Sequence, residues 1–158
     1  MLRVTAPTPH HPLFPPMRRG VTLCELMVVL AVLAVVTAIT LPRFGGLLDW
    51  IAVDTAAGHI TASIAVARNA AVMHGTRGRA VIASDSLRID RWLGDSWGAL
   101  LRWPGPAEEG VSLDVSNPAV VFDAIGLGWG VSNTKIELRR GGRVATITVS
   151  RTGRVKRW

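Results

Sequence analysis

The sequence predicts an α+β chain, in which a long N-terminal helix precedes a half that is rich in antiparallel strands. Residues 26–36 (LMVVLAVLAVV) carry no polar side chain and form the centre of the predicted helix. After Gly75 the pattern changes to short alternating apolar and polar runs separated by turn residues. With 49% hydrophobic residues among 158, the composition excludes a disordered chain.

The apolar N-terminal segment is long enough to cross a membrane. The 21 residues from 21 to 41 form a helix of about 32 Å, which matches a hydrocarbon core of roughly 30 Å. Arg18 and Arg19 precede this segment, and the positive-inside rule therefore places its N-terminal end in the cytoplasm. A cleaved signal peptide is the alternative. The sequence "TLPRF" that follows the segment lacks the expected cleavage site, which favours a retained anchor.

Glu25 is out of place at the start of this apolar segment. A charged carboxylate in a membrane helix costs on the order of 2.5–3.5 kcal/mol, and less near an interface. One interpretation is a residue hydrated by lipid headgroups. The other requires a positive partner within the membrane, such as an α-amino group created by cleavage just upstream.

The helix is predicted to continue beyond the membrane as an amphipathic segment over residues 42–75. Pro42, Gly45 and Gly46 weaken the helix directly after the span. Apolar residues then recur at helical spacing on one face: Val53, Ile60, Ile64, Ala67 and Ala71. Other faces carry polar residues: Asp54, His59, Ser63 and Arg68. We expect the helix to end near His74 and to place its apolar face on the domain that follows.

Residues 76–158 are predicted to form a β-rich globular domain. "RAVIAS" and "SLRIDRWL" form a hairpin around Asp85, and "GVSLDV" and "AVVFDAIG" are further strands. "TKIELRRGGRVATITVS" is the clearest hairpin, in which Gly141 and Gly142 both supply positive φ values. "RTGRVKRW" turns at Gly153 into a last edge strand.

No catalytic residue, metal site or cofactor is predicted, and the chain is not expected to be an enzyme. Cys24 is the only cysteine, and neither His59 nor His74 belongs to a metal-binding motif. "GLGWG" (126–130) and the Glu108–Glu109 pair are predicted to lie in loops. Most tryptophans are expected to pack in the core or against loops rather than to form a stacking surface, namely Trp92, Trp97, Trp103 and Trp129.

The chain carries a formal net charge of +7, and the last twenty residues hold seven cations. The cations are Arg139, Arg140, Arg143, Arg151, Arg154, Lys156 and Arg157. Such a cluster is suited to phosphate binding, with Arg154, Lys156 and Arg157 as the candidate nucleic-acid contacts. The favoured alternative is a solvated face or a docking surface for acidic partners.

The N-terminal segment "RRGVTLCELMVVLAVLAVVTAITLP" resembles the class III signal of type IV prepilins and type II secretion pseudopilins. The resemblance implies that a prepilin peptidase cuts between Gly20 and Val21 and methylates the Val21 amine, where the family normally has Phe. Glu25 then becomes the fifth mature residue. Residues 1–20 form the leader, and Met17 is an alternative start that gives the compact leader "MRRG".

The C-terminal half resembles the globular part of the GspH/FimT family of minor pseudopilins. The matching residues are "VVFDAIGLGWG", "KIELRRGGRVATITVS" and the terminal "TGRV". The family fold implies an antiparallel β-sandwich-like domain packed on the C-terminal half of the long helix. "GRVKR" (153–157) is similar to the basic tail through which some FimT-like members are linked to DNA uptake.

The resemblance implies a structural function as a minor pseudopilin of a type II secretion system, assembled into a short periplasmic pseudopilus. Glu25 would pair with the N-terminal ammonium of an adjacent subunit. The implied partners are the prepilin peptidase, other major and minor pseudopilins, the inner-membrane assembly platform and membrane lipid. The implied location is the inner membrane, with a periplasmic C-terminal domain. A DNA-binding minor pilin of a type IV pilus is the alternative.

Overall fold

The computed structural model describes residues 20–130 and 132–158. The expected leader therefore lies outside the described residues, apart from Gly20. The chain divides into two compact units, Met1–Ile39 and Thr40–Trp158. One helix, α1 (Leu23–His74), contributes residues to both units and is long and apolar enough to cross a membrane.

Within the first unit, α1 has no buried face. Every large apolar side chain from Leu26 to Ile39 is exposed to solvent. A helix that is apolar on all sides is stable in lipid or among other apolar helices, and not in water. This part of α1 is therefore a candidate membrane anchor.

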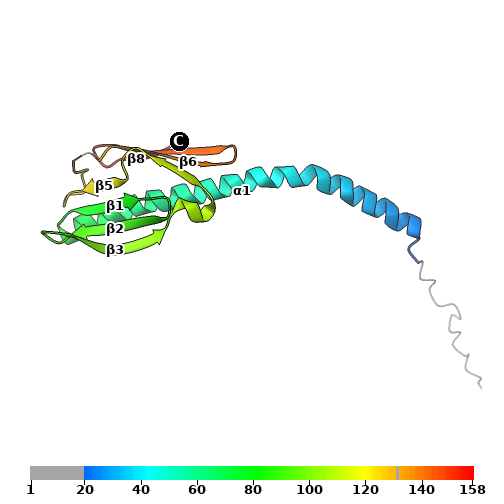
Figure 1. Cartoon of the computed structure of the whole chain (residues 1–158), viewed down its shortest axis with the longest axis horizontal. Helices are drawn as coiled ribbons and strands as arrows, with labels where there is room; N and C mark the ends of the chain where they lie inside the picture. The colour runs from blue at the N-terminus through cyan, green and yellow to red at the C-terminus, as the bar shows by residue number, and fades with distance from the viewer. Residues whose placement is uncertain (1–19, 131) are drawn as a thin grey trace, which may run out of the picture. The chain divides into compact units, whose positions relative to one another are not determined.

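The second unit contains two four-stranded antiparallel sheets, and Figure 1 shows them along the C-terminal part of α1. The first, sheet A, has the order β3-β2-β1-β5. Its strands are β1 (Gly78–Ile82), β2 (Ser86–Trp92), β3 (Trp97–Pro104) and β5 (Ala119–Phe122). The second, sheet B, has the order β4-β6-β7-β8. Its strands are β4 (Ser112–Val115), β6 (Thr134–Arg140), β7 (Arg143–Val149) and β8 (Val155–Arg157).

One hydrophobic core joins α1 to both sheets. The predicted helix face is buried from Val53 to Ala71, and it packs with residues such as Ile89 of sheet A and Ile147 of sheet B. This arrangement confirms the predicted fold class, a long helix packed on antiparallel sheets. Ser63 was expected on a polar face, and that expectation is wrong. Its side chain is buried, and the hydroxyl donates to the Ile60 carbonyl at 2.8 Å. This hydrogen bond offsets the cost of burying the hydroxyl.

The hairpin between β6 and β7 has the predicted two-residue turn, but only one of its glycines has a positive φ. Gly141 has φ 51°, whereas Gly142 is not among the positive-φ residues. A turn that needs a positive φ only at its first central position is of the II′ kind, and it closes the register between Arg140 and Arg143. The expectation of two positive values is therefore corrected.

The region between residues 92 and 110 departs most from the sequence-based predictions. Residues 97–104 form the edge strand β3, although no alternating apolar and polar pattern in the sequence predicts a strand there. The expected loop at Glu108 and Glu109 is the short 3₁₀ helix η1 (Pro106–Glu109). The tryptophans were expected to pack in the core or against loops: Trp103 lies partly buried against the core, Trp92 and Trp97 are partly buried outside it, and Trp129 is exposed.

β1 approaches the backbone of α1 closely at Gly78, the first residue of the strand. A Cβ atom added there would overlap the Ala67 carbonyl oxygen and would lie 3.0 Å from the Ala71 Cβ. Glycine is required at this position because the obstacle is helix backbone, which cannot rotate away.

We expect Gly78→Ala to lower the stability of the second unit by about 1–3 kcal/mol, because the extra methyl overpacks the contact between helix and sheet. Gly142→Ala is the matched control, since a Cβ there meets no atom within 4 Å. Thermal unfolding of the full-length chain in detergent, followed by near-ultraviolet circular dichroism, measures both. Equal melting temperatures for Gly78→Ala and the unsubstituted chain would contradict the predicted overlap.

Candidate functional site

The predicted processing site lies immediately before α1. Gly20 and Val21 precede the helix in non-helical backbone, and the Val21 side chain is 72% exposed. The Thr22 hydroxyl accepts a hydrogen bond from the Glu25 amide at 3.1 Å, which caps the first turn of the helix. The peptide bond between residues 20 and 21 is thus in exposed, non-helical chain next to a defined helix start.

Glu25 lies in the first turn of α1, exposed, and forms no ion pair with any described residue. Thr22 and Glu25 have the spacing of a capping box, and a carboxylate in the first turn also interacts favourably with the helix dipole. The Glu25 backbone amide therefore completes the cap, and the carboxylate favours the helix start through the dipole. That role is distinct from the predicted pairing with an adjacent subunit.

The predicted weak point of the helix remains a prediction. The backbone of α1 is helical through Pro42, Gly45 and Gly46. A Cβ at either glycine would meet nothing within 4 Å, so neither glycine is required by packing in this chain.

Two of the three candidate nucleic-acid contacts line one groove on the outer side of sheet B. The groove has a volume of about 560 Å³ and receives the side chains of Arg154, Lys156 and Lys135. Hydroxyl and amide groups complete its polar lining, from Ser116, Asn133, Thr134, Thr148 and Ser150. Cations together with neutral hydrogen-bonding groups and no carboxylate suit the binding of an anion.

The charge of this groove is partly compensated at its rim. Glu137 forms ion pairs with Lys135 and Arg139, both at 2.5 Å. Hydrogen bonds from Lys135 and then Arg139 lower the pKa of the Glu137 carboxyl to about 2. Glu137 is therefore ionised at any physiological pH, and the uncompensated charge of the groove comes from Arg154 and Lys156.

Arg157, the third candidate nucleic-acid contact, does not line the groove and instead contacts α1. Lys156 pairs with Thr148 in the register of sheet B, whereas Arg157 pairs with Ile147, whose side chain is buried. Side chains alternate between the faces of a strand, so Arg157 points towards the helix. Its guanidinium forms an ion pair with Asp54 of α1.

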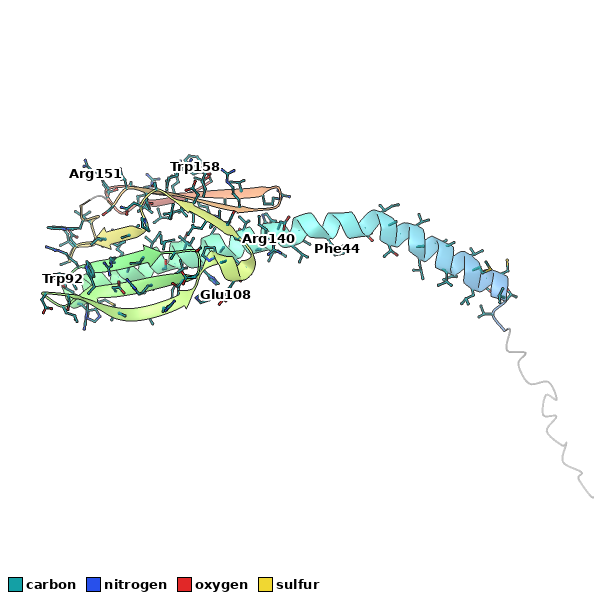
Figure 2. The ribbon with its side chains drawn as sticks, in the orientation of Figure 1. Phe44, Trp92, Glu108, Arg140, Arg151 and Trp158 are labelled. Carbon is teal, nitrogen blue, oxygen red and sulfur yellow. The ribbon has the colours of Figure 1, made fainter. Side chains whose placement is uncertain are left out.

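A second ion pair joins α1 to the other end of sheet B. Arg140 Nε lies 3.1 Å from Asp49 Oδ1, and Arg140 also donates to the Glu109 carbonyl. Figure 2 shows Arg140 beside α1 and close to the segment that carries Glu108. The seven-residue basic cluster is therefore not one patch, because Arg140 and Arg157 hold sheet B to the helix.

The other described side chains that were candidates for catalysis or metal binding do not lie together at one site. Among the described residues, no group of three or more His, Cys, Asp and Glu side chains is placed to hold a metal ion. His59 is exposed on α1, and His74 Nδ1 lies 3.2 Å from Arg91 Nη1. Sequence reasoning missed a row of arginine and tryptophan side chains at one end of sheet A, which includes Trp129 from the loop after β5. Its sequence signal was the abundance of both residue types in the segment 77–103.

We expect Arg157→Gln and Asp54→Asn to destabilise the second unit through the same ion pair. A double-mutant cycle should give a coupling energy of about 0.2–1 kcal/mol, because both side chains are partly exposed. Lys156→Gln should show no coupling to Asp54. Denaturant unfolding of the full-length chain measures each variant, and strictly additive effects for Arg157 and Asp54 would contradict the assigned contact.

Comparison with known proteins supports both halves of this description. Residues 16–41 match the family model described as the prokaryotic N-terminal methylation motif. No curated protein sequence matches the chain at a significant level.

The structure is similar to two crystal forms of the type IV minor pilin FimU from Pseudomonas aeruginosa strain PAO1, each at 16% identity over 66% of this chain. The TM-scores are 0.57 and 0.55, with 86% and 91% of those chains covered.

The chain therefore combines a prepilin-type methylation motif with the fold of a minor pilin. This combination confirms the predicted resemblance to GspH/FimT-like minor pilins and pseudopilins.

Proposed function

We propose that this chain is a non-enzymatic subunit of a type IV pilin-like filament, in the first instance a minor pseudopilin of a type II secretion system. The observation that carries the proposal is the methylation motif at the start of a helix whose later part is built into a pilin-like domain. A prepilin peptidase cuts between Gly20 and Val21 and methylates the new amine.

In this proposal the first part of α1 resides in the inner membrane, with the C-terminal domain in the periplasm, until the assembly platform extracts it. Its exposed apolar surface is then covered by the helices of other pseudopilins. The exchange of lipid for apolar helices keeps that surface away from water throughout assembly. The Pro42–Gly46 region gives the helix a place to bend or stretch during this transfer.

Glu25 determines the register of the subunits in this proposal. Cleavage creates an ammonium group at Val21, and a carboxylate and an ammonium that are buried together among apolar helices stabilise one another. If only one of the pair is present, a charge is left uncompensated in an apolar environment. The capping contact between Thr22 and Glu25 places the carboxylate in the first turn, near the end of the helix where the ammonium of a neighbour arrives.

We expect Glu25→Gln to reduce incorporation into filaments strongly while cleavage at Gly20 continues. Glutamine preserves the capping-box spacing but lacks the charge, so this variant separates subunit pairing from helix capping. N-terminal mass spectrometry of the membrane fraction measures processing, and the sheared filament fraction measures incorporation.

Thr22→Ala is the matched control, since it removes the cap and keeps the carboxylate. Normal incorporation of Glu25→Gln together with loss in Thr22→Ala would mean that assembly requires the Thr22 cap and not the Glu25 charge, which would contradict the proposed pairing. Complementation of a strain that lacks this chain, scored for protein secretion and for surface pili, shows whether the chain serves a type II secretion system or a type IV pilus.

A second candidate function is DNA binding by a minor pilin of a type IV pilus. The FimU structures that resemble this chain are of a type IV minor pilin, which supports the pilus assignment. The groove lined by Arg154 and Lys156 supports the binding of an extended polyanion, since phosphate contacts require unpaired cations.

If this candidate is correct, Arg154→Gln and Lys156→Gln should each weaken DNA binding and lower the salt-dependence slope by about one. Arg157→Gln should leave the slope unchanged, because that guanidinium is paired with Asp54. Titration of the full-length chain in detergent with duplex DNA at several salt concentrations tests both statements. An absence of binding at low salt would remove this candidate.

A further inference from the structure

A row of arginine and tryptophan side chains crosses one end of sheet A on the face away from the core. Trp129 begins the row, and the Arg77 Cζ lies 4.2 Å from its ring centroid and 6.0 Å from that of Trp92. Trp92 and Trp97 meet edge to face, with centroids 5.2 Å apart and planes at 66°. Trp92 is labelled on this sheet in Figure 2.

In the next row of the same face, two arginines share one buried carboxylate. Asp90 is only 2% exposed and binds Arg79 at 2.5 Å and Arg88 at 3.0 Å. Arg79 also lies over the Trp97 ring, at 4.3 Å from its centroid. These contacts hold Arg79 and Trp97 in place and form a rigid base beside the first row.

Arg77 differs from Arg79 because it has no carboxylate. Its contacts within the described residues are the two indole rings. Asp123 follows the neighbouring strand, but its Oδ1 accepts the amides of Ile125 and Leu127 at 3.1 and 2.8 Å. Arg77 is thus half-buried, and its guanidinium lies between two aromatic rings without a carboxylate partner among the described residues.

Apolar side chains are exposed on the loop that carries Trp129. The loop after β5 exposes Ile125 by 73%, Leu127 by 44% and Trp129 by 49%. Tryptophan and arginine dominate the energetics of protein interfaces, particularly where apolar groups surround them and exclude water.

We propose that this surface, formed by Arg77, Trp92, Trp129 and the adjoining Leu127, docks a protein segment in which carboxylates are flanked by apolar side chains. A carboxylate would take a bidentate position on Arg77, and the apolar neighbours would cover the indoles and Leu127. The docking surface does not depend on the assignment of the chain to a secretion system or a pilus.

The arrangement of the rings favours an acidic peptide over a nucleic acid. Sequence-tolerant binding of single strands uses open aromatic faces on which bases stack. Here Arg77 lies on Trp129 and Arg79 lies on Trp97, so one face of each ring is already covered by a guanidinium group. A carboxylate would bind the unpaired guanidinium of Arg77 and needs no free ring face.

The test uses the full-length chain in detergent and a short fluorescent peptide that alternates Glu with Leu, followed by anisotropy. We expect saturable binding that weakens with salt and falls about tenfold or more in Arg77→Gln. Arg143→Gln, which removes the same charge from the exposed turn of sheet B, should bind as the unsubstituted chain. Trp129→Ala gives a second measurement if Arg77→Gln fails to fold, and it should also weaken binding.

Two controls decide the outcome. The same peptide with Gln in place of Glu should not bind, and equal binding of the two peptides would overturn the role of the carboxylates. A single-stranded oligonucleotide of equal charge should bind less tightly than the peptide. If it binds more tightly and depends equally on Arg77, the surface is a nucleic-acid site and the proposal is wrong. Unchanged peptide binding in Arg77→Gln also overturns it.

Discussion

The packing of the alanine-rich face of α1 against both sheets is the contact on which the second unit depends. Alanines at positions 56, 57, 67 and 71 are almost fully buried, and Gly78 lets β1 approach the helix backbone where a larger residue would not fit. Small residues bring the helix close enough for Ile60 and Ile64 to contact the core of both sheets. Each fully buried isoleucine contributes about 1.5–3 kcal/mol, so this close approach determines how much apolar surface is removed from water.

In the first unit the same helix has no such cover, and its large apolar side chains are exposed. A helix that is apolar all round cannot be stable in water, whereas a helix with one apolar face can be covered by its own domain. The change of pattern along α1 therefore separates a part that needs lipid or other subunits from a part that needs only this chain. Two ion pairs, from Asp49 and Asp54 to sheet B, lie at the start of the second part.

The elements with a clear period were predictable from sequence. The buried helix face and the β6–β7 hairpin follow patterns of 3.6 and two residues. Strand β3 was not predictable, because a register shift between Ile89 and Asp90 interrupts the alternation along "WGALLRWP". Strand alternation places Lys156 and Arg157 on opposite faces of β8. Only the structure shows that α1 lies on the face of Arg157. Trp92 and Trp97 face each other across the β2–β3 hairpin, whereas the contact between Arg77 and Trp129 joins segments far apart in the chain, which no local pattern reveals.

Cations outnumber carboxylates in this chain, 18 to 11, so carboxylate placement decides which arginines are available. Asp49, Asp54 and Asp90 all bind arginines that hold the domain together, and Glu137 compensates the rim of the groove on sheet B. Arg77 and Arg154 have no carboxylate partner among the described residues, and they lie on different sheets. The two arginines lie in different surroundings, Arg77 between tryptophan rings and Arg154 in a groove lined by hydroxyl groups. The surrounding groups make their ligands chemically distinct.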